Sequence, residues 1–367
     1  MDALRRSALL AAAGAIAALA ACESPPRGDC EPHPPAGRIG SICGFRNPED
    51  VEAVASRGLL LVSQMADLDG TPGSIAGLSL DLARAPRVLW PAASRERAER
   101  APTRGWGDPG CPGPPDPARF MPHGISAGVE RPDGELPLAV VVHGEREAVE
   151  LFALSGAAES AALDWRGCVA LPPDTSGNDL ELQPDGSLVI ANYMPSQSGL
   201  RALFYQIAGG LGRDTGDVLL WTPGQGFRHL PGSAGPTPNG VLRSRDGRSV
   251  FAAQTGSGNV VAIDLERGAA SPIRIGGHPD NLSFDSRGQI LVASHLSGLA
   301  FLRCAAAAGP CRAPWTLHAI DPGTRTAREI LRHDGSAVGG IASAARVGDR
   351  IFFGAVFGDR IGVVELE

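Results

Sequence analysis

Six stretches of this chain repeat one pattern, and this repeat limits the possible folds more than any other feature. Each stretch has one or two polar residues, a short alternating segment, a turn and an apolar run, and the stretches begin about 58 residues apart on average. The turns read PDG, RDG, SRG or VGD, which supply the positive-φ residues that tight β-hairpins require. The stretches begin at Glu49, His123, Asn178, Asn239, Asp280 and Gly339.

A second apolar stretch follows the hairpins, so each repeat unit contains four strands. Residues 217–230, 259–268 and 316–331 are examples, whereas long amphipathic helical periodicity is scarce. The 48 glycines and 31 prolines are spread along the chain, which is typical of many short elements joined by turns. Because the repeat length is close to that of propeller blades, we predict an all-β fold. It is a six-bladed β-propeller of residues 38–367, with four antiparallel strands per blade.

In a propeller, the residues at the start of each innermost strand lie at one mouth of the central channel. In this chain these residues are mostly acids and amides: Glu49, Asp50, His123, Asn178, Asp179, Asn239, Asp280, Asn281 and Gly339. Such hard oxygen ligands suit Ca²⁺, which takes about six to eight of them. Five protein ligands would leave positions open for water or substrate, as Lewis-acid catalysis requires. The alternative is that these side chains only cap strand starts and turns.

The chain resembles the paraoxonase family of calcium-dependent lactonases and arylesterases, relatives of the gluconolactonase-type propellers. The resemblance extends from about Phe45 to Glu365 and depends on the order and register of short motifs. These motifs are Glu49-Asp50, Pro122-His123-Gly124-Ile125-Ser126, Val140-Val141-Val142-His143, Asn178-Asp179, Pro238-Asn239-Gly240, Pro279-Asp280-Asn281, Ser294-His295 and residues 351–357.

This resemblance implies two calcium sites in the channel. The ligands of a catalytic calcium would be Glu49, Asn178, Asn239, Asp280 and Asn281. The ligands of a structural calcium, deeper in the channel, would be Asp50, Asp179 and the backbone carbonyl of Ile125.

The resemblance also implies roles for three histidines. His123 and His143 match the family's pair that is proposed to activate water, and His295 matches another active-site histidine. Calcium would polarise the carbonyl of a lactone or ester, and His123, its tautomer held by His143, would take a proton from the attacking water. Structural hydrogen bonding is the alternative role for His123 and His143.

The chain departs from the family in three places. It has no cysteine near its C-terminus to tie the chain ends together, so closure of the ring would depend on strand pairing. Asn192 stands where the family has an acid, and insertions at 84–119 and 201–216 lie where active-site loops vary. Two other functions therefore stay open: a gluconolactonase-type sugar lactonase, and a non-catalytic, surface-anchored binding propeller with structural calcium.

The N-terminus has the pattern of an export signal. Arg5 and Arg6 precede an Ala/Leu run that ends in Leu19-Ala20-Ala21-Cys22, which resembles a bacterial lipobox. We predict a signal peptide over residues 1–21, lipidation of Cys22, a flexible tether over 22–37, and an outer-membrane or periplasmic location. The alternative is a plain secretory signal with a chance cysteine.

Cysteines and charge agree with an exported protein. Six cysteines follow Cys22 with no CxxC pair, which favours disulfides over zinc. Cys304–Cys311 is the preferred pair, and the sequence leaves the connectivity of the other four cysteines open, with Cys111–Cys168 and Cys30–Cys43 as one possible pairing. A net charge of −7 argues against a nucleic-acid partner, and the absence of lysine excludes Schiff-base chemistry. We expect a monomer that acts on a small lactone or ester.

Overall fold

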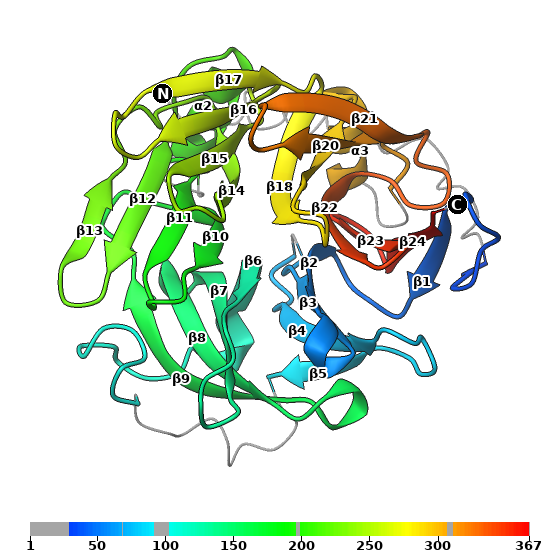
Figure 1. Ribbon diagram of the computed structural model, residues 1–367, viewed down its shortest axis with the longest axis horizontal. Helices are drawn as coiled ribbons and strands as arrows, with labels where there is room; N and C mark the ends of the chain where they lie inside the picture. The colour runs from blue at the N-terminus through cyan, green and yellow to red at the C-terminus, as the bar shows by residue number, and fades with distance from the viewer. Residues whose placement is uncertain (1–28, 68, 92–102, 196–198, 307–310, 367) are drawn as a thin grey trace, which may run out of the picture.

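Six four-stranded antiparallel sheets form a ring around a central axis in the computed structural model (Figure 1). The described residues are 29–67, 69–91, 103–195, 199–306 and 311–366. Five sheets use four consecutive strands, and the sixth combines three C-terminal strands with the first strand of the chain. The predicted six-bladed β-propeller is confirmed. The signal peptide, Cys22 and residues 23–28 of the tether lie outside the described residues.

The first three blades are each built from consecutive strands, in order from the axis outward. Blade one contains β2 (Pro48–Val54), β3 (Leu59–Gln64), β4 (Ser74–Ser79) and β5 (Arg87–Trp90), with the 3₁₀ turn η1 (Ala55–Arg57). Blade two contains β6 (Phe120–Ala127), β7 (Leu136–Gly144), β8 (Ala148–Ser155) and β9 (Ala162–Ala170), with η3 (Pro117–Arg119) and η4 (Ala158–Ser160). Blade three contains β10 (Gly177–Leu182), β11 (Leu188–Asn192), β12 (Asp217–Thr222) and β13 (Gly226–His229).

The other three blades complete the ring. Blade four contains β14 (Pro238–Arg243), β15 (Ser249–Gln254), β16 (Asn259–Asp264) and β17 (Ala270–Arg274). Blade five contains β18 (His278–Phe284), β19 (Ile290–His295), β20 (Trp315–Asp321) and β21 (Thr326–His333). Blade six contains β22 (Ile341–Val347), β23 (Arg350–Ala355), β24 (Arg360–Glu365) and β1 (Gly40–Cys43).

Strand pairing closes the ring. The N-terminal strand β1 is the outer strand of blade six, with Gly40 opposite Val363 and Cys43 opposite Arg360. The sequence analysis expected the ring to close by strand pairing, without a disulfide between the chain ends. This pairing is present. The preferred disulfide Cys304–Cys311 is present, and the other four cysteines pair as Cys30–Cys43 and Cys111–Cys168. Three disulfides are typical of proteins exported to an oxidising compartment.

The blades pack face to face, and their contacts form the core. Trp90 of blade one contacts Phe120 of blade two with ring centroids 4.1 Å apart, and Phe152 and Trp165 of blade two are fully buried in the same cluster. Complete burial of a side chain of this size contributes about 1.5–3 kcal/mol. This packing holds the inner strands rigidly around the axis.

All six inner strands begin at one face of the ring, which we call the site face. Second strands run the opposite way, so β11 ends at the site face with Asn192 and β19 ends there with His295. Two helices follow these strands on the site face: α2 (Gly199–Gly210) after β11 and α3 (Gly298–Ala306) after β19. The repeat pattern did not predict these helices, because each lies in an insertion between strands, outside the repeated segments. No described helix is long and apolar enough to span a membrane.

Candidate metal centre and histidine chain

A β-bulge interrupts every inner strand, and in five of the six strands it lies at the residues that the sequence singles out. Pairing shifts register between Pro48 and Asp50, and the other five inner strands have a matching shift near their start. A bulge places two residues opposite one and redirects their side chains. Gly124 and Gly240, which occupy two of these bulges, have no room for a Cβ. At Gly240 it would lie 2.5 Å from the carbonyl oxygen of Asp280. The bulges therefore bring polar side chains from different blades together around the axis.

The five predicted ligands of the catalytic calcium are all buried, and four of them have an oxygen without a hydrogen-bond partner among the described residues. Those buried atoms are Glu49 Oε2, Asn178 Oδ1, Asn239 Oδ1 and Asn281 Oδ1. Leaving one such atom unpaired costs about 1–3 kcal/mol, so four at one place indicate a further partner. Hard, mostly neutral oxygens beside two carboxylates fit a calcium ion.

The electrostatics of this cluster also fit a cation. Burial, and then the negative charges of Asp50, Asp280 and Asp179, raise the pKa of Glu49 well above its ordinary value. Burial and the charge of Asp50 do the same to the pKa of Asp179. Burial raises the pKa of Asp50 to about 6. A bound dication would relieve this repulsion and favour the ionised carboxylates.

The predicted ligands of the structural calcium have a different bonding pattern, because their carboxylates accept hydrogen bonds from backbone amides. Asp50 Oδ2 accepts a hydrogen bond from the N–H of Ile125 at 2.8 Å, and Asp179 Oδ2 accepts one from the N–H of Val241 at 2.9 Å. Each bond joins an inner strand to that of the next blade. Asp50 thus contacts the backbone amide of Ile125 and not its carbonyl. The role of the Ile125 carbonyl as a metal ligand stays a prediction. Among the described residues, no group of three or more His, Cys, Asp or Glu side chains could by itself hold a metal. The predicted centres therefore depend on amide or carbonyl oxygens.

A chain of hydrogen-bonding groups leads away from Glu49. His123 Nε2 lies 3.7 Å from Glu49 Oε1, and His123 Nδ1 lies 3.4 Å from His143 Nε2. His143 Nδ1 lies 2.7 Å from Glu147 Oε2, which also accepts a bond from the Ser176 hydroxyl at 3.2 Å. The structure therefore brings the predicted histidine pair together. Burial and the neighbouring His143 lower the pKa of His123 to about 3, so His123 is neutral at physiological pH.

Glu147 was not predicted from the sequence. It follows His143 in the turn between β7 and β8, four residues further along the chain. The available signal was a charged turn immediately after an apolar strand that ends in histidine. In this position its carboxylate orients the His143 ring and favours the tautomer with a proton on Nδ1.

The third predicted histidine, His295, contacts a different ligand of the predicted catalytic calcium, Asp280. Its Nε2 lies 2.7 Å from Asp280 Oδ2, and its ring contacts Phe301 of α3 with centroids 4.4 Å apart. His295 is therefore placed to orient Asp280. Tyr193, also missed from the sequence, has a pKa raised to about 12 by burial and by the charge of Asp280. Its hydroxyl therefore stays protonated beside the site.

Asn192 holds strands together instead of supplying charge. Its Oδ1 accepts a bond from the N–H of Ser176 at 3.2 Å, and its Nδ2 donates to Asp217 at 3.0 Å.

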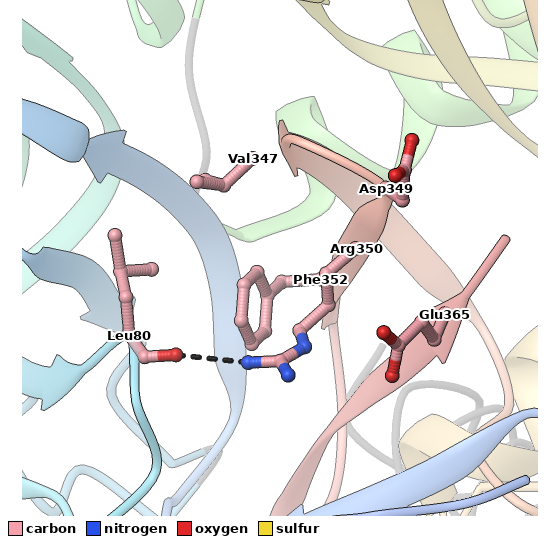
Figure 2. Close-up of a pocket in the computed structure, with 6 residues that line it drawn as sticks. All are labelled: Leu80, Val347, Asp349, Arg350, Phe352 and Glu365. Atoms are coloured by element: carbon pink, nitrogen blue, oxygen red, sulfur yellow. Dashed lines mark hydrogen bonds between the residues drawn. The ribbon is translucent and has the colours of Figure 1, made fainter. Parts of the chain in front are cut away.

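A cavity of about 200 Å³ lies away from the candidate centre, beyond the far ends of β22 and β24 (Figure 2). It is lined by Leu80, Val347, Asp349, Arg350, Phe352 and Glu365. Because β22 begins at the site face and ends at Val347, this cavity lies on the opposite face and takes no part in the candidate centre.

No protein-family model and no curated protein matches the chain. Solved structures do match. A gluconolactonase from Xanthomonas campestris has 17% sequence identity and a TM-score of 0.54, covering 94% of this chain and 100% of its own. A luciferin-regenerating enzyme has 13% identity and a TM-score of 0.53, covering 90% of this chain and 95% of its own. At these identities the likenesses support the propeller fold alone, and the resemblance to paraoxonases stays a prediction.

Proposed function

We propose that this protein is a calcium-dependent hydrolase of lactones or aryl esters. The observation that carries the proposal is the set of four unpartnered, buried oxygens, one on Glu49 and three on asparagines of the same predicted ligand set, with a neutral histidine next to Glu49. Buried polar groups without partners cluster where a ligand belongs. The likeness to a gluconolactonase agrees with lactone hydrolysis.

Each residue of the centre has a role in this proposal. Glu49, Asn178, Asn239, Asp280 and Asn281 would hold the calcium, with Asp280 oriented by His295. When bound, the cation polarises a carbonyl and stabilises negative charge on its oxygen.

The histidine chain would move the proton. Neutral His123 accepts a proton from the water whose oxygen attacks the carbonyl carbon, and the resulting imidazolium lies within 3.7 Å of the Glu49 carboxylate. When the bond to the leaving oxygen breaks, His123 returns that proton to the leaving alkoxide. His143, held by Glu147, keeps the His123 ring in place throughout.

A sugar lactonase is the second candidate, and the named gluconolactonase among similar structures favours it. A non-catalytic binding propeller is the third outcome. The test is hydrolysis of aliphatic lactones, aryl esters and aldonolactones by protein with verified calcium content, before and after chelation. Calcium-dependent turnover of the first two substrates supports the proposal, and turnover of aldonolactones alone supports the second candidate. Calcium binding without any turnover identifies a binding module, and turnover unchanged after complete calcium removal overturns the metal mechanism.

We also propose that Cys22 carries a lipid anchor. Its support is the Leu19-Ala20-Ala21-Cys22 motif together with three disulfides that indicate export. Cys22→Ser should release the protein from membranes in soluble form. A periplasmic wild-type protein without an acyl chain in its mass spectrum would contradict the anchor.

A further inference from the structure

The three methionines that the structure describes all lie at the site face, and they differ in exposure. Met65 and Met194 follow the site-face ends of β3 and β11, and Met121 is the second residue of β6, which begins at that face. Met194 is 1% exposed and Met65 is partly buried, whereas Met121 is 36% exposed. Because oxidation of a sulfur side chain depends on its exposure, an oxidant in solution reaches Met121 first.

Met121 lies beside His143. The two residues are directly opposite each other in the pairing of β6 with β7. Side chains of opposite residues in an antiparallel pair project from the same face of the sheet, with their Cβ atoms about 4.5–5.5 Å apart. A Cβ on Gly144 would lie 3.4 Å from the Cγ atom of Met121, so the methionine side chain packs along the end of β7. The exposed thioether is therefore a neighbour of the histidine chain.

Both ring nitrogens of His143 are engaged in that chain. Nδ1 lies 2.7 Å from Glu147 Oε2, and Nε2 lies 3.4 Å from His123 Nδ1. A thioether is only a weak hydrogen-bond acceptor. In its reduced form, Met121 is therefore an apolar neighbour that leaves both hydrogen bonds intact.

Oxidation would change the chemistry of this neighbour. A lone pair of the sulfur attacks hydrogen peroxide, the O–O bond breaks, one oxygen stays on the sulfur and the other leaves as water. The product, methionine sulfoxide, is polar and chiral, and its oxygen is a strong hydrogen-bond acceptor. Beside His143, this oxygen competes with Glu147 and His143 Nε2 for the N–H groups of the two histidines. The sulfoxide would therefore release the ring of His123 from its orientation.

We propose that Met121 is a reversible oxidation site that switches off the histidine chain. The oxidant is a peroxide, which a protein with three disulfides meets in an oxidising compartment. A methionine sulfoxide reductase restores the thioether, as two thiols become a disulfide and the oxygen leaves as water. The effect on turnover rests on the proposed hydrolase function, whereas the oxidation of Met121 and the change at His143 do not.

Peptide mass spectrometry tests the site itself. Calcium-loaded protein is treated with hydrogen peroxide, and the fraction of each methionine that has gained one oxygen atom is followed in time. Since Met121 is 36% exposed and Met194 is 1% exposed, we expect Met121 to be oxidised at least about tenfold faster, with Met65 between them. Equal rates at the three positions, or faster oxidation of Met65 or Met194, would overturn the proposal.

Magnetic resonance of labelled histidines tests the link to the histidine chain. On oxidation, the imidazole resonances of His143 and His123 should shift in the wild-type protein and return after treatment with a methionine sulfoxide reductase and a dithiol. In Met121→Leu, which keeps the apolar volume and has no sulfur, the same resonances should not respond to peroxide. Unchanged resonances of His143 in protein whose Met121 is fully oxidised would contradict the switch.

Turnover gives the functional readout. Peroxide should lower kcat of the wild-type protein about tenfold or more at constant calcium affinity, and the reductase should restore it. Met121→Leu should start within about twofold of the wild-type rate and resist peroxide.

Met65→Leu is the matched control, and it should lose activity as the wild-type protein does. An equal loss in Met121→Leu would assign the sensitivity to another residue and overturn the switch. Oxidation of Met121 with shifted His143 resonances, in a protein without turnover, would support the oxidation site and contradict the hydrolase alone.

Discussion

The two sets of polar residues on the inner strands are neighbours in sequence but have different bonding. Glu49 retains an unpartnered buried oxygen, whereas the next residue, Asp50, has both oxygens bonded to backbone amides, of Val51 and Ile125. Asp179 likewise accepts a bond from the next blade. A carboxylate satisfied by amides can join blades whether or not a cation is present. The five predicted ligands of the catalytic calcium, which we call the outer set, retain four unpartnered oxygens. The outer set therefore depends on a ligand for its stability.

The strongest test of this difference is Asp280→Ala. This change removes one of the two charges of the outer set, so calcium affinity and hydrolysis should fall together, the rate by about 10⁴. Calorimetry and turnover measure the two effects. Asp349→Ala, an exposed acid on the opposite face, is the control. Full activity in Asp280→Ala would show that the outer set does not hold the catalytic metal.

His123→Gln should separate catalysis from metal binding. It removes the proposed base and leaves the five ligands in place, so the rate on the best lactone should fall by about 10²–10⁴. Calcium affinity should persist in calorimetry. His229→Gln, at an exposed histidine of blade three, should leave both quantities unchanged. A near-wild-type rate in His123→Gln would give this histidine a structural role.

A smaller effect is expected from Glu147→Gln. The carboxylate acts on the reaction only through His143, so kcat should fall about 10- to 100-fold while calcium affinity stays constant. Glu145→Gln, in the same turn but exposed, is the matched control. Glu147→Asp should restore part of the loss. A fall in calcium affinity instead of kcat would place Glu147 in the structural support of the metal centre.

The smallest effect is expected from Asp50 and Asp179, the two aspartates bonded to backbone amides of the next blade. It is a dependence of the free energy of unfolding on pH. In calcium-free protein, burial raises the pKa of Asp50 from 3.8 to about 6. The folded state then binds more protons than the unfolded state in this interval, so the free energy of unfolding should decrease as pH rises from 4 to 6. We expect a decrease of about 1–3 kcal/mol in urea unfolding, and a smaller one with saturating calcium. An increase over this interval would contradict the assigned burial.

The residues of the candidate centre could be predicted because each occurs at the same position in a repeat. Glu49, Asn178, Asn239 and Asp280 all precede an alternating segment and a hairpin turn, and the propeller brings these equivalent positions to one axis. Glu147 could not be predicted in this way, since it lies in a turn outside the repeated register. Its role depends on the direction of the His143 ring.

The amino-acid sequence by itself determined the number of blades, the strands and the position of the polar residues near the axis. Alternation of apolar residues and turn residues is local information, and it repeats six times. Only the tertiary structure decided which oxygens stay unpartnered and which face of α2 is exposed. The first depends on bonds between blades, such as Asp50 to Ile125. The second depends on the contact of Gly209 with Thr237, where the absence of one side chain turns the apolar side chains of the helix away from the protein.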